Sequence, residues 1–229
     1  MSAWLDRLSA EVEARLTSLI DRPLVVGLSG GVASGKSTVA RALAARLAED
    51  GLSVRIVSTD GFLLSNAELT ARGLMERKGF PESYDWEALS ALLAAVSSGS
   101  AELIAPTYSH ETYDVGPLET FARPRVLILE GLIALDGRVR PLDLGIYLDA
   151  DEDDLIAWYT ERFMALGRWS APRLADRLAA AGSPEALALD VWSRINGPNL
   201  RDHILPGRDR ADIVLRKAHD HSIRLARPD

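Results

Sequence analysis

Four residues of a glycine-rich stretch form the strongest chemical signal in this sequence. Gly30 is followed, after four intervening residues, by Gly35, Lys36 and Ser37, which matches the spacing G-x-x-x-x-G-K-[ST]. Glycines at these positions let the backbone curl so that successive N–H groups point at phosphate oxygens. The lysine then reaches the β- and γ-phosphates of a nucleotide, and the serine hydroxyl binds Mg²⁺. The predicted nucleotide-binding residues of this stretch are Gly30, Gly31, Ser34, Gly35, Lys36, Ser37 and Thr38.

The elements around this stretch are those that the motif requires. Residues 23–29 are a short apolar, β-branched run typical of a buried strand, and residues 36–51 place apolar side chains at helical spacing. Gly51 stands where a glycine commonly ends a helix. A glycine-rich turn that binds nothing is the alternative, but the flanking strand and helix favour a phosphate site.

Two acidic residues follow other strand candidates. Asp60 comes directly after an apolar run at 53–58, and Glu130 ends another at 125–130. Ligands of α/β sheets lie at the carboxyl ends of the strands, so both carboxylates are expected beside the phosphate site. Asp60 is predicted to accept the proton of the hydroxyl that is phosphorylated, and Glu130 to hold Mg²⁺ directly or through its waters. The alternatives are a turn aspartate in an Asp-Gly pair and a capping glutamate.

Arginines in and after a helix candidate at 151–167 add positive charge. Arg162 is a candidate for stabilising the charge on the transferring phosphoryl group. Arg168, Arg173 and Arg177 follow in a stretch that could close over the nucleotide. A solvated helix face is the alternative, and spacing alone does not distinguish the two interpretations.

The composition excludes several classes of protein. The 229 residues carry a formal net charge of −7, whereas a nucleic-acid groove needs a basic face. Disulfides and thiolate metal sites are excluded because the chain has no cysteine, as is common in a reducing cytoplasm. Its apolar runs are too short to span a bilayer, and its charged N-terminus does not resemble a signal peptide. We therefore expect a cytoplasmic protein that binds neither membranes nor nucleic acid.

The order of elements predicts one α/β domain over residues 1–229. Strand and helix candidates alternate, and the near-continuous apolar character of the strands is typical of a parallel sheet buried on both faces. Residues 1–22 are expected to form a leading amphipathic helix. The strands are expected at 24–29, 53–58, 125–130, 144–149 and 211–216, and the later helices at 36–51, 86–97, 151–167 and 184–195.

A polar segment after the second strand resembles the type I, bacterial pantothenate kinases. Residues 59–85, TDGFLLSNAELTARGLMERKGFPESYD, carry the family's Arg-Gly-Leu-Met and Gly-Phe-Pro-Glu-Ser-Tyr-Asp strings with minor variation. Such long, irregular strings are specific, because no secondary-structure rule generates them. The other matching strings, in the same order, are APTYSHETYD (105–114), LILEGL (127–132), YLDA (147–150), WYTERF (158–163), INGPNL (195–200) and HILPGRDRADIVLRKAHDH (203–221).

This resemblance implies a fold, an activity and a site. It implies the three-layer fold of the phosphoribulokinase/uridine kinase-like P-loop kinases, with a five-stranded parallel sheet in the order 2-3-1-4-5 and a short lid. It also implies transfer of a phosphoryl group from ATP, with Mg²⁺, to the primary hydroxyl of pantothenate in coenzyme A synthesis, by a homodimer. The implied catalytic residues are Lys36, Asp60 and Arg162, the pantothenate-binding residues Tyr108, His110, Tyr159, Phe163 and Asn199, and the adenine-binding residues Lys217 and His221.

The chain departs from the family pattern mainly in the lid, residues 164–182. The stretch 164–178 offers Trp169 where the family has several phenylalanines and tyrosines, and Leu166 stands in one of the aromatic places. In the family these aromatics close over pantothenate and house the thiol arm of the inhibitor coenzyme A. We therefore expect weaker inhibition by coenzyme A than in the usual enzyme.

Two other functions stay open at this point. One is a kinase similar to uridine kinase or phosphoribulokinase that acts on another small alcohol or sugar. The other is a regulatory nucleotide-binding protein, which is less favoured for two reasons. The guanine-reading string Asn-Lys-x-Asp does not occur, and all three residues implied in phosphotransfer, Lys36, Asp60 and Arg162, are present.

Overall fold

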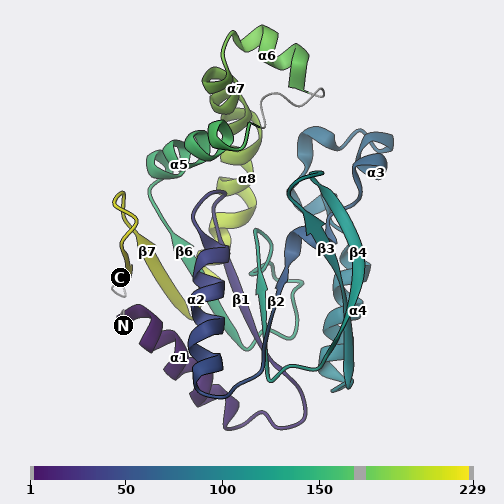
Figure 1. The fold of residues 1–229 in the computed structure, drawn as a ribbon, viewed down its shortest axis with the longest axis vertical. Coiled ribbons are helices and arrows are strands. Elements are labelled where there is room, and N and C mark those ends of the chain that lie inside the picture. Colours follow the sequence, from purple (N-terminus) through teal and green to yellow (C-terminus); the bar gives the residue numbers. More distant parts are fainter. Residues whose placement is uncertain (1–2, 168–173, 227–229) are drawn as a thin grey trace.

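The centre of the molecule is a sheet of six strands in the order β2-β5-β1-β6-β7-β8 (Figure 1). The structure is a computed structural model that describes residues 3–167 and 174–226. All pairings among the first five strands are parallel, in the predicted order, and β8 adds an antiparallel edge strand that the prediction lacks. The strands are β1 (Leu24–Gly30), β2 (Val54–Ser58), β5 (Val126–Glu130), β6 (Leu144–Asp149), β7 (Ile213–Lys217) and β8 (Ile223–Leu225).

Helices cover both faces of this sheet, which gives the expected three layers (Figure 1). On one face α1 (Ala3–Leu16) and α2 (Lys36–Glu49) pack their apolar sides against alternate residues of the strands. On the other face lies α4 (Trp86–Ser97), whose N-terminus is capped by the side chain of Asp85. The central strands are buried on both faces because successive side chains of β1 and β5 point to opposite layers.

A two-stranded antiparallel ribbon stands beside the sheet and is absent from the sequence-based prediction. It consists of β3 (Glu102–Ser109) and β4 (Asp114–Ala122). Only one face of β3 packs on the core, through Leu103 and Ala105, and most of β4 is exposed. An exposed ribbon carries little of the apolar signal that identifies a buried strand.

A helical segment projects beyond the carboxyl ends of the central strands, at the top of Figure 1. It contains α5 (Glu152–Ala165), α6 (Ala175–Ala181) and α7 (Pro184–Val191). The Ser183 side chain caps α7 by accepting a hydrogen bond from the backbone N–H of Ala186 at 3.1 Å, as expected for a Ser-Pro helix start. Part of the predicted lid, 168–173 with Arg168, Trp169 and Arg173, lies outside the described residues.

After α7 the chain stays helical for longer than predicted, but with an altered hydrogen-bond pattern. Residues 192–196 and 200–204 form wider π-type turns on either side of α8 (Gly197–Asn199), and a 3₁₀ segment follows at 205–210. A short helix, α3 (Asn66–Ala71), lies next to the upper end of the β3–β4 ribbon in Figure 1 and begins in a reciprocal capping box. Within the two described ranges, no helix combines the length and the apolar character needed to cross a bilayer.

Candidate active site

The phosphate loop connects β1 to α2 and is shaped by glycines. A Cβ at Gly30 would lie 2.5 Å from the carbonyl oxygen of Leu148, so only glycine fits there. Gly35 has φ +100 and precedes α2 without any side chain capping the helix. No side chain therefore competes with a ligand at this end of α2, where the helix dipole and the N–H groups of its first residues favour an anion.

Lys36 is the first residue of α2, and its side chain folds back onto the phosphate loop. Its Nζ donates hydrogen bonds to the carbonyl oxygens of Gly30 at 3.0 Å and Gly31 at 2.8 Å. Burial lowers the pKa of this amine, against the opposing effect of the negative charges of Glu130 and Asp60. The lysine thus lies within the electrostatic reach of both predicted carboxylates.

Ser37 and Glu130 bring two oxygen atoms together beside the loop. The Ser37 hydroxyl donates to Oε1 of Glu130 at 3.1 Å. The Glu130 side chain is nearly buried at the end of β5, 7% exposed. The chain can leave β5 here because Gly131 has φ +147, and a Cβ at Gly131 would lie 1.8 Å from Oγ1 of Thr59. A hydroxyl and a carboxylate in contact are the hard oxygen donors that suit Mg²⁺.

Asp60 lies in a 3₁₀ turn directly after β2. The Ser58 hydroxyl accepts a hydrogen bond from the Asp60 backbone N–H at 3.3 Å. The next residue, Gly61, allows the turn to pack directly on β3, because a Cβ there would lie 2.4 Å from the carbonyl oxygen of Pro106. These contacts hold the turn so that the Asp60 carboxylate faces the same cavity as Lys36.

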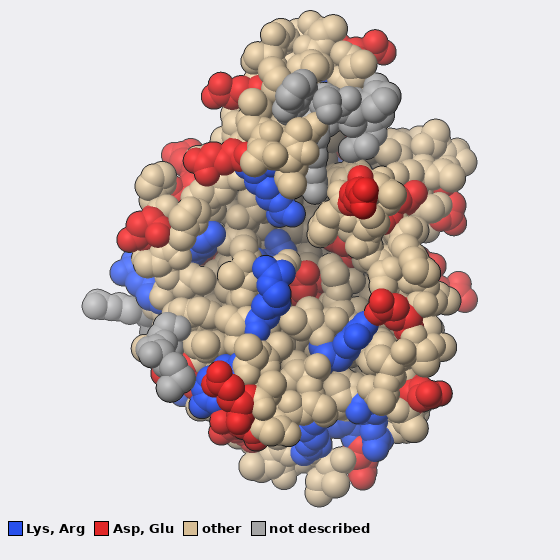
Figure 2. All heavy atoms as spheres, viewed as in Figure 1, with Lys and Arg blue, Asp and Glu red and all other residues tan. Residues whose placement is uncertain are grey.

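A cavity of about 410 Å³ unites most of the predicted residues. It lies where the loop, the carboxyl ends of β2 and β5, and the segments β3 and α5–α7 meet. Figure 2 shows this face of the molecule hollowed below the α5–α7 segment, with basic side chains beside the hollow. The predicted residues that line the cavity are Lys36, Ser37, Asp60, Tyr108, His110, Glu130, Tyr159, Arg162 and Phe163.

Two further residues line the cavity next to Tyr108 and His110, and the sequence analysis missed both. Lys78 places its Nζ 5.4 Å from the centre of the Tyr108 ring and 4.5 Å from that of Tyr113. The same Nζ donates to Oδ1 of Asn66 at 2.8 Å and to the Tyr113 carbonyl at 2.6 Å. Both residues belong to strings that match the family, Lys78 to 59–85 and Tyr113 to 105–114, and these strings were the available signal.

The wall opposite to this ribbon comes from α5, α6 and α7. Arg162 and Phe163 lie side by side on α5, and the Tyr159 ring is 5.9 Å from that of Phe163. From α6, Arg177 donates to both carboxylate oxygens of Glu76, at 2.8 and 3.1 Å, and to Asp190. Arg177 therefore joins α6 to the segment after α3 at the cavity wall, where it lies between two acidic side chains.

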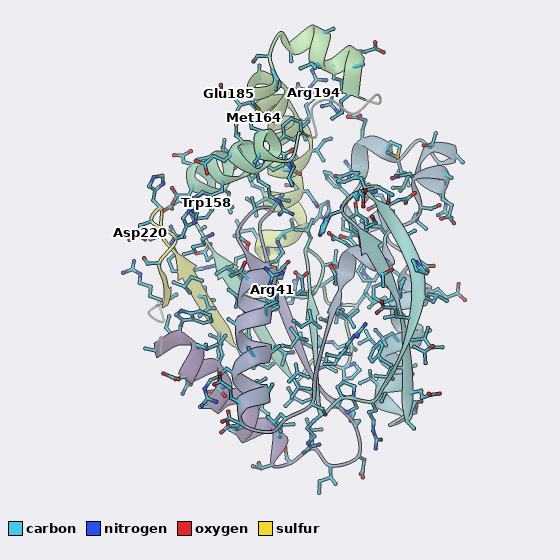
Figure 3. The ribbon with its side chains drawn as sticks, viewed as in Figure 1. Arg41, Trp158, Met164, Glu185, Arg194 and Asp220 are labelled. Carbon is cyan, nitrogen blue, oxygen red and sulfur yellow. The ribbon has the colours of Figure 1, made fainter. Side chains whose placement is uncertain are left out.

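Other predicted nucleotide-binding residues lie beside the loop and do not contribute to the lining. Lys217 donates from Nζ to the Ser34 carbonyl at 2.9 Å and lies 4.0 Å above the Trp158 ring. The His221 ring stacks on the Trp158 ring, with the two ring centres 4.9 Å apart. Figure 3 shows Trp158 on α5 next to the turn that carries Asp220. The Ser34 hydroxyl is buried and has no hydrogen-bond partner among the residues that the structure describes.

Asn199, which the resemblance implies as an acceptor-binding residue, lies next to a segment that lines the cavity. Asn199 is buried, does not line the cavity, and donates from Nδ2 to the carbonyl oxygen of Gly79 at 2.8 Å. Asn196, three residues earlier in the matching string INGPNL, lines the cavity instead. The string contains two asparagines three residues apart, and the structure places Asn196 in the lining and Asn199 against Gly79.

Comparison with known proteins identifies a matching family and similar proteins that are named pantothenate kinases. The family model described as the phosphoribulokinase/uridine kinase family matches residues 25–168. A pantothenate kinase of Sorangium cellulosum (strain So ce56) is 49% identical over 221 residues, which cover 89% of this chain and 71% of that protein. A pantothenate kinase of Clavibacter michiganensis subsp. michiganensis (strain NCPPB 382) is 48% identical over 218 residues, with coverages of 88% and 68%.

Two solved structures that share this architecture are described as kinases. A D-glycerate 3-kinase from Cryptococcus neoformans var. grubii aligns with a TM-score of 0.67 at 13% identity, covering 99% of this chain and all of that one. A possible uridine kinase from Bacillus stearothermophilus aligns with a TM-score of 0.60 at 20% identity, covering 91% and 98%. At these identities the likeness concerns the fold alone.

Proposed function

Because this chain belongs to the phosphoribulokinase/uridine kinase family, we propose that it uses ATP to phosphorylate the primary hydroxyl of pantothenate. The observation that carries the proposal is the single cavity in which the phosphate-loop residues Lys36 and Ser37 face Asp60 and the pair Tyr108 and His110. The identity of 49% to a pantothenate kinase over most of both chains supports this choice of acceptor.

The donor end of the cavity fits the triphosphate of ATP. The uncapped start of α2 and the glycine backbone provide N–H groups for phosphate oxygens. Phosphate oxygens would draw Lys36 from the carbonyls that it now contacts. Ser37 and Glu130 would hold Mg²⁺, which neutralises charge on the β- and γ-phosphates when bound. The Trp158–His221 stack lies next to the loop, where a purine base would extend.

The transfer itself requires a base and a charge stabiliser, and the cavity offers both. Asp60 accepts the proton of the acceptor hydroxyl as its oxygen attacks the γ-phosphorus, and the bond between that phosphorus and the β–γ bridging oxygen breaks. The products are the phosphate ester and ADP. Arg162, across the cavity on α5, balances the negative charge that develops on the transferring group.

The acceptor end matches a small anionic molecule with hydroxyl and amide groups. Tyr108, His110, Tyr159 and Asn196 supply hydrogen-bonding groups, and Phe163 supplies apolar surface. Lys78 adds a positive charge to this end, as a carboxylate-bearing acceptor requires. The proposal extends to a cytoplasmic location, where ATP is available, and to a homodimer, as in the family that the sequence resembles.

The test compares acceptors directly. Purified protein is incubated with ATP and Mg²⁺ and with pantothenate, uridine or a sugar alcohol, and ADP release is followed by a coupled assay. Thermal shift gives an independent readout, since a ligand at a hundredfold excess over Kd stabilises the fold by about 2.7 kcal/mol. Turnover of pantothenate supports the proposal. Turnover of uridine or a sugar alcohol without turnover of pantothenate would show that the protein is a kinase of the same family that acts on another acceptor.

A further inference from the structure

Asn199 connects two walls of the cavity without touching its interior. Its side chain is 3% exposed, and its Nδ2 donates to the Gly79 carbonyl oxygen at 2.8 Å, across 120 residues of sequence. Gly79 itself lines the cavity, whereas Asn199 does not. Any effect of Asn199 on the acceptor therefore passes through the residues that it holds.

Both partners of this hydrogen bond adjoin residues that line the acceptor end. On one side Gly79 follows Lys78, which faces the aromatic residues of the ribbon. On the other side Asn199 lies three residues after Asn196, in the helical run that descends from α7 through α8 (Figure 1). The bond thus links the position of Lys78 to that of Asn196.

The Gly79 peptide is held from both sides, in a conformation that needs to be held. Gly79 has φ +95, which is the left-handed region. Its N–H donates to the Ser83 hydroxyl at 2.9 Å, and the same hydroxyl donates to the Phe80 carbonyl at 2.7 Å. Asn199 takes the remaining polar group of this residue, the carbonyl oxygen. Loss of either contact frees one side of the turn that carries Lys78.

The Asn199 amide makes one hydrogen bond within the described part of the chain, and that bond goes to Gly79. Oδ1 is buried and has no hydrogen-bond partner in the described part of the chain. An apolar side chain at this position would leave the Gly79 carbonyl oxygen without this donor. The contact that Asn199 makes is therefore the one that fixes the Gly79 peptide.

We propose that Asn199 is a positioning residue that sets the distance between Lys78 and Asn196, and so the fit of the acceptor, while the ATP site is independent of it. The proposal rests on the proposed kinase function of the cavity. Phe80 and His203, whose rings meet edge to face at 5.7 Å, form a second contact between the same two segments and keep them together when the hydrogen bond is lost.

The test is the substitution Asn199→Leu, which keeps the number of side-chain heavy atoms and removes the donor. We expect the KM for the acceptor to rise about tenfold, the scale of one buried hydrogen bond, with the KM for ATP within twofold of wild type. Val96→Ala is the matched control, because Val96 is fully buried on α4 and does not line the cavity. The control should lower the melting temperature by a similar amount and leave both KM values unchanged.

The positioning role of Asn199 and the choice of pantothenate as acceptor are tested by different measurements. The wild-type protein is assayed first, and the KM ratio is then measured with whichever alcohol it phosphorylates, so a wrong acceptor does not decide the result. Equal changes in both KM values, or none in either, would overturn the positioning role. Should Asn199→Leu fail to fold, Ser83→Ala, which frees the N–H of Gly79, must show the same selective rise in the acceptor KM.

Discussion

Asp60 is the residue whose replacement tests the proposed chemistry most directly. Asn is almost isosteric with Asp, and the contacts that place residue 60 come from its backbone N–H to Ser58 and from the packing of Gly61 on Pro106. Asp60→Asn should therefore keep the turn and remove only the group that accepts the proton. General base assistance contributes about 10²–10⁴-fold, so kcat should fall by that factor, about 2.7–5.4 kcal/mol in the barrier.

The same substitution should leave nucleotide binding almost intact. It removes a negative charge that acts on Lys36, and the phosphates of ATP restore negative charge there. We expect the Kd for ATP, measured by calorimetry with Mg²⁺, to stay within a few-fold of wild type. Asp50→Asn is the control, because Asp50 follows the far end of α2, about 20 Å from Lys36 at 1.5 Å per residue. Retention of most of the phosphotransfer rate in Asp60→Asn would show that Asp60 is only a turn residue.

Four other outcomes are expected. Lys36→Ala should weaken ATP binding and lower kcat together, in contrast to Asp60→Asn, because the amine acts on the phosphates before and during transfer; an unchanged Kd would contradict this role. Burial lowers the pKa of Lys36, so its neutral amine is populated at lower pH than that of an exposed lysine. An amine-reactive reagent should therefore label Lys36 at lower pH than it labels a free lysine analogue. ATP and Mg²⁺ should protect Lys36 from this labelling. Ser37→Ala should raise the Mg²⁺ concentration needed for half-maximal rate several-fold, and no shift would remove Ser37 from the metal site. Coenzyme A should inhibit weakly, because residues 164–178 are poor in aromatic side chains and apolar contact is worth roughly 25 cal/mol per Å²; tight inhibition in the coupled assay would refute this reasoning.

The parts that could be predicted from sequence are those encoded over a few neighbouring residues. The phosphate loop was recognisable because its glycines, lysine and serine act through a local turn, with Gly30 and Gly35 in conformations that favour glycine. The buried strands were recognisable from continuous apolar runs, and their carboxyl ends located Asp60 and Glu130. The resemblance to known kinases supplied the order of the five parallel strands, which the sheet confirms.

The tertiary structure decided which side chains meet when the local pattern is uninformative. The ribbon of β3 and β4 carries Tyr108 into the cavity, yet its exposed strands lack an apolar signal. Counting along INGPNL does not tell that Asn196 lines the cavity and Asn199 contacts Gly79, because the segment that carries Gly79 is 120 residues away in sequence. Sequence determined the chemistry that each residue can perform, whereas packing between distant segments determined which of these residues share one cavity.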